Sequence, residues 1–244
     1  MNIIFRFFKN ISQLFFFFKR KILPGFYIDK KSLVIDIGSG DKPFWRADVF
    51  CDNLSLGDNQ RYSRSKIVRN LGLFFNGDIS NMSFKDHTFD FSFCSHMLEH
   101  VEDPEAALRE IMRISKSGYI EVPNAIVESI KPFHSHLWSI YCVKDQLVFV
   151  RKSSAMHNII LENGKRYRYL DHLIINPFIR LYWKDKINYR IINELGDESV
   201  FQGDGSPEHS EMRKNNINWY LILIKIIRFF FYVKKEIKSE DLTR

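Results

Sequence analysis

The chain is poor in cysteine, glycine and proline. Its three cysteines, Cys51, Cys94 and Cys142, form no C-x-x-C pair, so neither a disulfide framework nor a thiolate zinc site is expected. Eleven glycines and seven prolines among 244 residues, with 45% hydrophobic residues, exclude collagen-like, mucin-like and wholly disordered chains. The sequence therefore predicts a globular protein with a sizeable core, located in a reducing cytosol.

The middle of the chain has no excess of positive charge. Residues 1–21 carry five cations and no acid, and residues 213–238 carry seven cations against Glu236. The last six residues add −1 to the total of +7, so residues 22–212 have a net charge of −3. Such a body does not supply the basic groove that binds nucleic acid, and no nucleic-acid partner is expected.

A long uncharged apolar run is also missing, although both ends of the chain are apolar. The stretch from Ile217 to Val233 contains Lys225 and Arg228, and each central charge costs about 2.5–3.5 kcal/mol on insertion into a bilayer. The two cations are three residues apart and so share one face of a helix, which predicts that this helix lies in the headgroup region of a membrane.

Three segments follow from these patterns. Residues 1–24 have apolar residues at i, i+3, i+4 spacing among several cations, which predicts a basic amphipathic helix and not a signal peptide. Residues 25–212 form the folded domain, and residues 213–244 contain the basic apolar C-terminal helix. An anionic membrane surface is the expected partner of the two ends. Packing of both ends on the body or on each other is the alternative.

Short apolar runs alternate with helix signals between the two ends, which is typical of an α/β fold with a mostly parallel sheet. A helix is expected over 104–116, with Asp103 as its N-cap and Gly118 at its end. A hairpin is expected over 137–151 and another pair of strands over 180–193. The strands of the main sheet are expected at 33–37, 49–52, 74–76, 89–94 and 119–122.

The strand at 33–37 runs directly into a glycine turn that includes Gly38, Ser39 and Gly40. Two glycines one residue apart remove the Cβ atoms that would block a ligand at the carboxyl end of the strand. A third glycine is missing, which disfavours NAD and FAD. A plain tight turn is the alternative for this motif taken alone.

Polar residues follow the ends of other strands as well. A carboxylate at Asp52 can accept hydrogen bonds from both hydroxyls of a ribose. Asp78 can accept from an adenine amino group while Ile79 packs against the ring, and Ser95 faces the glycine turn across the same edge. The sequence therefore predicts that four strand ends converge on one ligand site.

The order of these motifs resembles the class I S-adenosylmethionine-dependent methyltransferases, in particular the group called methyltransferase type 11. The resembling blocks are VIDIGSGDKPF at 34–44, ADVFCDN at 47–53, GDIS at 77–80 and FDFSFCSHMLEHVEDPEAALREIMRISKSGYIEVPN at 89–124. The resemblance implies a Rossmann-like sheet, a cofactor half at 33–124 and an acceptor-binding region at 125–212.

S-adenosylmethionine is the cofactor that the resemblance implies. Asp36, Gly38 and Gly40 would meet its methionine portion, as would Ser95, while Asp78 and Ile79 would meet its adenine. Only about a dozen residues separate Gly40 from Asp52, so the helix after the glycine turn must be very short. Either Asp48 or Asp52 could bind the ribose, and Asp52 is favoured because it follows the apolar run.

Histidines are the candidates for a general base, which a hydroxyl or protonated amine acceptor would need. His134 and His136 follow the fifth strand, where an acceptor pocket could form, and are chosen as the catalytic pair over His96 and His100. Packing or surface roles are the alternative for these side chains. The segment 96–100 also spells H-x-x-E-H, an inverted zinc-protease pattern, but no distal acidic ligand is recognisable and no metal site is expected.

The sequence predicts a methyltransferase at the cytoplasmic face of a membrane, acting on a small-molecule or lipid-linked acceptor. O-methylation of a lipid-linked or cell-surface saccharide intermediate is the first expectation. Methylation of a quinone-type or other small hydrophobic acceptor is the alternative. A cofactor-binding interaction protein without transferase activity and a nucleotide-sugar or NAD-linked enzyme are the rivals from other classes.

Overall fold

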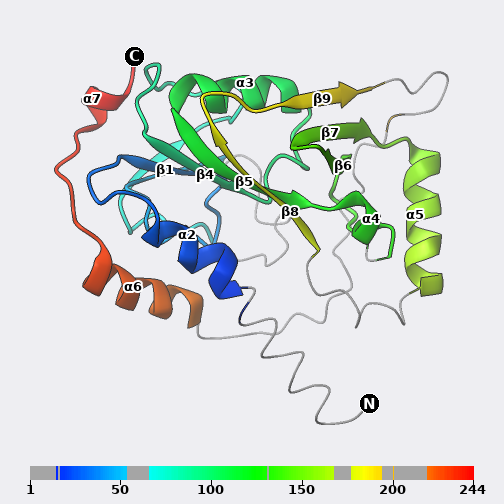
Figure 1. Ribbon diagram of the computed structural model, residues 1–244, viewed down its shortest axis with the longest axis horizontal. Helices are drawn as coiled ribbons and strands as arrows, with labels where there is room; N and C mark the ends of the chain where they lie inside the picture. Colours follow the sequence, from blue (N-terminus) through cyan, green and yellow to red (C-terminus); the bar gives the residue numbers. More distant parts are fainter. Residues whose placement is uncertain are drawn as a thin grey trace, which may run out of the picture.

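A six-stranded sheet forms the centre of the protein (Figure 1). The computed structural model describes residues 15, 17–53, 66–130, 132–167, 177–193, 200 and 219–244. The strand order is β3-β2-β1-β4-β5-β8, with β8 antiparallel to β5 and the other pairs parallel. The expected mostly parallel α/β sheet is confirmed. Its strands are β1 Val34–Ile37, β2 Val49–Asp52, β3 Leu73–Asn76, β4 Phe91–Ser95, β5 Ser117–Pro123 and β8 Phe178–Lys184.

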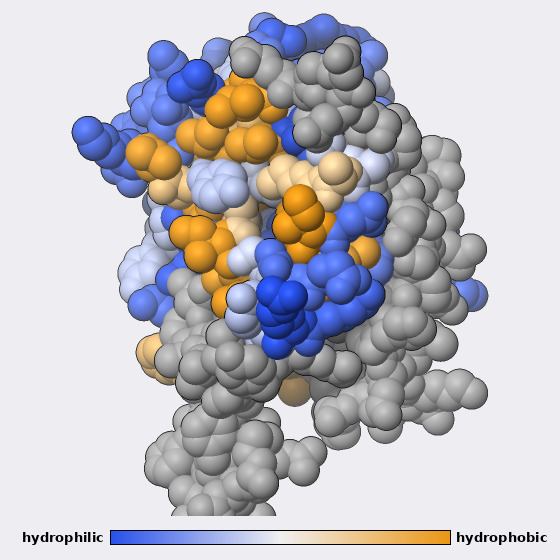
Figure 2. Space-filling view, turned by 90° about the vertical axis from the view of Figure 1, so that its right-hand side faces the viewer, coloured by the Kyte–Doolittle hydropathy of each residue, from blue (hydrophilic) through white to orange (hydrophobic). Residues whose placement is uncertain are grey.

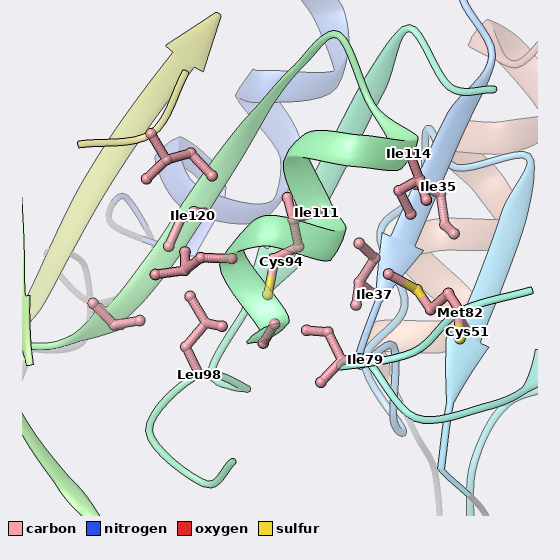
Figure 3. Packing of buried hydrophobic residues seen from close by; sticks show 14 of the residues in the cluster. Ile35, Ile37, Cys51, Ile79, Met82, Cys94, Leu98, Ile111, Ile114 and Ile120 are labelled. Carbon is pink, nitrogen blue, oxygen red and sulfur yellow. The ribbon is translucent and has the colours of Figure 1, made fainter. Parts of the chain in front are cut away.

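One face of the sheet packs against helix α3, Pro104–Ile114. The Asp103 carboxylate accepts a hydrogen bond from the Ala106 amide at 2.9 Å, which confirms the expected N-cap. Figure 3 shows Ile111 and Ile114 of this helix facing the apolar side chains of β1 and β4. The expected helix end at Gly118 is wrong, because α3 stops at Ile114 and Gly118 lies within β5.

Gly118 is needed in the strand for a different reason. A Cβ atom on Gly118 would lie 2.5 Å from the Ser92 carbonyl oxygen and 2.7 Å from Nε1 of Trp183. The glycine therefore allows close packing between β5 and its neighbours, and a helix terminus is not involved.

The opposite face of the sheet is covered by elements from both ends of the chain. The connection from β1 to β2 contains turns and no helix, in agreement with its short length. The π-helical turn η1, Phe18–Ile22, the short helix α2, Leu23–Phe26, and helix α6, Trp219–Phe231, lie on this side (Figure 1). A parallel sheet needs cover on both faces, so the terminal elements supply the missing layer. Their shared cluster is Ile22, Val34, Phe44, Trp45, Ala47, Phe50, Phe93, Tyr119, Ile224 and Ile227.

Polar contacts fix α6 and the segment after it to the body. Arg228 donates to the carbonyl oxygens of Trp45, Ala47 and Leu71 at 2.7–2.8 Å. Tyr232 and Lys235 bond the buried Asp48 carboxylate at 2.8 Å. The expectation that Arg228 shares a membrane-facing surface with Lys225 is therefore wrong.

A second, three-stranded sheet follows β5 in the chain. The expected hairpin is confirmed as β6, Trp138–Val143, and β7, Gln146–Arg151. The two expected strands over 180–193 exist but do not pair with each other, because β8 joins the main sheet and β9, Tyr189–Ile192, pairs parallel with β7. The other helices among the described residues are α4 Ala125–Glu128, α5 Ser154–Tyr167 and α7 Ser239–Leu242.

The described helices are too short or too polar to cross a bilayer. Helix α6 has 13 residues, which at a rise of about 1.5 Å each give roughly 20 Å against a hydrocarbon thickness of about 30 Å. Most of the expected N-terminal helix, at 1–14 and 16, lies outside the described residues, as do 168–176, 194–199 and 201–218. The boundaries proposed at 24, 25, 212 and 213 stay predictions.

Candidate active site

The glycine turn after β1 has the geometry expected of a ligand-binding loop. Gly38 and Gly40 have φ values of +72° and +52°, in the left-handed region that favours glycine. The Gly38 amide donates to the Cys51 carbonyl oxygen at 2.8 Å, which ties the turn to β2. Among the described residues, the nearest atom to a Cβ atom on Gly40 would be Asp52 Oδ2 at 3.9 Å, so these residues do not crowd this glycine.

Asp52 and Asp48 lie at opposite ends of β2. Asp52 Oδ2 accepts the Gly40 amide at 2.7 Å, so this carboxylate lies directly beside the glycine turn. Asp48 is buried at the other end, where its Oδ2 accepts the Val34 amide at 2.9 Å. The geometry therefore favours Asp52 over Asp48 for a ribose contact, which stays a prediction.

Asp36 lies on β1 immediately before the turn. Its side chain is buried and its Oδ2 accepts the Phe44 amide at 2.6 Å. Burial raises the pKa of Asp36 to about 7, although the Phe44 amide and the Lys21 ammonium act in the opposite direction. A carboxyl that titrates near neutral pH at a strand end is typical of a functional position.

Asp78 and Ile79 lie after β3 in different environments. Asp78 is exposed, and its Oδ1 accepts the Ser80 amide at 2.7 Å. The Ile79 side chain is 2% exposed and lies in the core near Ile37 and Met82 (Figure 3). The adenine contacts stay predictions, and the burial of Ile79 does not favour its part in them.

Ser95, at the end of β4, belongs to a buried polar network that the sequence did not reveal. Lys21 Nζ donates to Ser95 Oγ at 2.9 Å, and Ser95 Oγ donates to Glu121 Oε1 at 3.0 Å. The Arg20 guanidinium donates two hydrogen bonds to the Glu121 carboxylate, at 2.5 and 2.6 Å. The terminal segment therefore reaches the same strand ends as the glycine turn.

The sequence did not identify three residues of this network, Arg20, Lys21 and Glu121, as part of the site. The two cations resembled the rest of the basic N-terminal helix, so nothing in their spacing marked them as buried. Glu121 carried a usable signal, since it is an acid between apolar residues in a strand expected to be covered on both faces. Its carboxylate keeps a pKa far below the usual range, because the bonds from Arg20 and His96 outweigh the effect of burial.

A second cluster follows β4 and contains Glu99, His100 and His136. One ligand atom from each lies within 4.8 Å of the others, so this group could hold a metal ion. Burial acts to raise the pKa of Glu99, but the hydrogen bond with His96 and the charges of the nearby histidines have a larger effect and lower this pKa to about 2. Burial and the charge of His136 lower the pKa of His100 to about 4. The expectation of no metal stays a prediction.

The two histidines proposed as bases have different surroundings. His136 is buried, and its Nδ1 lies 3.0 Å from Glu128 Oε1, which also accepts Lys152 Nζ at 2.6 Å. His134 is half-buried, with its ring centroid 5.8 Å from that of His157. His136 is thus held in one orientation within the polar cluster, whereas a catalytic role for either histidine stays a prediction.

A pocket of about 320 Å³ lies among α4, β6 and α5. Its lining includes Ala125, Tyr141, Met156 and Ile160 and none of the glycine turn. Figure 2 looks onto the side of the molecule that carries α5 and shows apolar side chains at the surface beside polar ones. The pocket belongs to the region expected to bind the acceptor.

The strand ends fit the cofactor that the sequence implies. Ser39 Oγ is buried and has no hydrogen-bond partner among the described residues, so it is available to a ligand. The uncrowded position of Gly40 and the acidic groups of Asp36 and Asp52 suit a nucleoside that carries positive charge on its sulfonium and amino groups.

Residues 45–120 match the family described as the methyltransferase domain. The chain is also 32% identical over 184 residues to a demethylmenaquinone methyltransferase of Paenarthrobacter aurescens, covering 73% of this chain and 70% of that protein. The chain belongs to the class I S-adenosylmethionine-dependent methyltransferases. Its cofactor is S-adenosylmethionine, and the expectation of an enzyme is confirmed over that of a non-catalytic binding protein.

Solved structures similar to this methyltransferase are more distant. A methyltransferase from Thermotoga maritima is 17% identical, with a TM-score of 0.33, and covers 71% of this chain and 69% of its own. Another from Methanosarcina mazei is 18% identical, with a TM-score of 0.34, over 50% of this chain and 72% of its own. The family assignment rests on the sequence matches.

Proposed function

We propose that this methyltransferase acts on a hydrophobic, quinone-type acceptor held in a membrane. Its demethylmenaquinone methyltransferase relative supports this acceptor class over the lipid-linked or cell-surface saccharide that the sequence first suggested. When bound, S-adenosylmethionine supplies an activated methyl group, so this chain has mainly to hold the acceptor in line with it and exclude water. Asp36, Asp52 and Ser95 hold the cofactor, and His136 is the candidate base.

The observation that carries the membrane part is the exposed apolar face of α2 and α6. Phe229 and Phe230 are 82% and 70% exposed, and Phe26 packs on Phe231 at 5.2 Å between ring centroids, which joins the two helices in one surface. Exposed large apolar side chains gathered in this way are rare on soluble monomers. The exposed large apolar residues of the two helices and of the residues next to them are Phe18, Phe26, Tyr27, Ile222, Leu223, Ile226, Phe229, Phe230, Phe231 and Val233.

The exposed lysines near this face favour an anionic bilayer as its binding partner. Lys19 of η1, Lys225 of α6 and Lys234, which follows α6, are exposed, so lysines are neighbours in the chain of the exposed apolar residues. Each cation near an anionic membrane contributes about 1 kcal/mol. We therefore propose that α6 lies at the cytoplasmic face of the membrane and keeps the enzyme close to acceptors dissolved in the lipid.

Cosedimentation with vesicles tests the docking. The double variant Phe229→Ser/Phe230→Ser should lose at least about tenfold in partitioning to anionic vesicles, and Lys225→Glu should lose severalfold at low salt only. Ile159→Ser, which removes an exposed apolar side chain from α5, is the matched control and should bind normally. Equal binding by all three variants would refute the docking surface.

Transfer of labelled methyl groups tests the acceptor. Membranes are incubated with the enzyme and methyl-labelled S-adenosylmethionine, and the lipids are divided between hexane and a more polar solvent. Label in hexane supports a quinone-type acceptor, whereas label in the polar lipid fraction indicates a lipid-linked saccharide. Asp52→Ala should abolish the transfer in either case.

A further inference from the structure

Lys21 is a buried cation that the proposed reaction has not yet used. Its ammonium lies 2.9 Å from Ser95 Oγ and 4.9 Å from the centre of the Phe93 ring. An ammonium has three N–H donors, and within the described part of the chain Nζ makes the single hydrogen bond to Ser95. Two donors therefore remain for a ligand.

The acids nearest to Lys21 do not neutralise it fully. Glu121 already accepts two hydrogen bonds from Arg20 and one each from Ser95 and Tyr119. Its negative charge is therefore paired mainly with Arg20 and not with Lys21. Asp36 receives the Phe44 amide, and burial keeps its carboxyl partly protonated near neutral pH. A buried ammonium without an anion of its own is costly, so an added carboxylate would stabilise this site.

The location of Lys21 identifies the chemistry of that carboxylate. Side chains alternate along each strand, and Asp36, Ser95 and Glu121 occupy the sheet face covered by η1, at the strand ends beside the glycine turn. A ligand there that carries a sulfonium and an amino group also carries one anionic group, the carboxylate of its methionine portion. Acidic side chains can bind its cationic groups, whereas a cation such as Lys21 forms the stronger, charge-assisted hydrogen bond with the carboxylate.

We propose that Lys21 binds the carboxylate of the methionine portion of S-adenosylmethionine, so that η1 forms one wall of the cofactor site. Lys21 then determines which adenine nucleosides bind tightly. Ligands with an α-amino acid should be favoured over nucleosides that lack its carboxylate.

Calorimetry with three ligands tests this without measuring turnover. The probes are S-adenosylhomocysteine, its decarboxylated analogue, and 5′-methylthioadenosine, which lacks the whole amino acid. The unmodified enzyme should bind the decarboxylated analogue about 10- to 100-fold more weakly than S-adenosylhomocysteine. Lys21→Met should weaken S-adenosylhomocysteine by a similar factor and leave 5′-methylthioadenosine within about twofold. Lys19→Met, on an exposed lysine two residues earlier, is the matched control and should change neither.

Each result decides the matter. If Lys21 only supports the fold, Lys21→Met will weaken S-adenosylhomocysteine and 5′-methylthioadenosine equally, and the proposal fails. If Lys21→Met does not fold, the comparison on the unmodified enzyme still applies, since equal affinity for S-adenosylhomocysteine and its decarboxylated analogue overturns the proposal. Failure of the unmodified enzyme to bind any of the three ligands would instead contradict the cofactor assignment.

Discussion

Arg228 provides the sharpest test of how the C-terminal helix is held. Its guanidinium donates to three backbone carbonyl oxygens of the β1–β2 and β2–β3 connections, at 2.7–2.8 Å. A hydrogen bond from a charged group contributes about 1.5–3 kcal/mol, and water can partly replace these bonds because the side chain is only half-buried. Arg228→Met should therefore lower the free energy of unfolding by about 3 kcal/mol, which corresponds to roughly 6–12 °C in Tm for a chain of this size.

Lys225→Met is the matched control for this change. Lys225 lies on the same helix, three residues earlier, but is exposed. Its replacement should change the stability by less than about 0.5 kcal/mol and reduce binding to anionic vesicles. Urea unfolding followed by tryptophan fluorescence measures both variants, since Trp45 packs beneath the helix. Equal midpoints for the two variants would refute the packing role of Arg228.

Three further changes test the strand ends. Because burial favours the protonated carboxyl of Asp36, the unmodified enzyme should lose stability as pH rises from 3.8 to about 7, and Asp36→Asn should abolish this loss. Urea unfolding at pH 8 should therefore show the variant to be more stable by up to about 4 kcal/mol, and the variant should bind S-adenosylhomocysteine more weakly. Glu121→Gln should lower the free energy of unfolding by about 3 kcal/mol at pH 7, since Arg20 loses its buried carboxylate partner. The difference in stability between the variant and the unmodified enzyme should shrink as pH falls below 4.5, and an unchanged difference at pH 4 would contradict this. Gly40→Val should weaken S-adenosylhomocysteine by more than about tenfold, because a β-branched residue is strained at φ +52°; normal affinity in calorimetry would argue against a ligand beside this glycine.

Most of the main sheet could be predicted because its strands are local patterns. Each of the five expected parallel strands is a short apolar run that ends at a turn signal, and periodicity detects such runs. The Asp103 cap was likewise visible, since it depends on residues adjacent in the chain. The partners of β8 and β9 could not be predicted, because pairing depends on which sheet edge is left open after the other strands have assembled.

The terminal segments show a different limit. A basic amphipathic helix has the same sequence pattern whether its cations face lipid headgroups or buried carbonyl oxygens. Arg228 faces the carbonyl oxygens of Trp45 and Ala47. What decides the matter is the short β1–β2 connection, which leaves a sheet face for the terminal helices to cover. For the same reason Lys21 reaches Ser95 across 74 positions of the sequence, a contact that no local pattern could reveal.

Titration calorimetry of the unmodified enzyme with S-adenosylhomocysteine tests the central claim most directly. We expect one molecule to bind per chain, with NAD failing to displace it and Asp52→Ala losing most of the affinity. Absence of binding, or displacement by NAD, would contradict the assignment of these strand ends as an S-adenosylmethionine site.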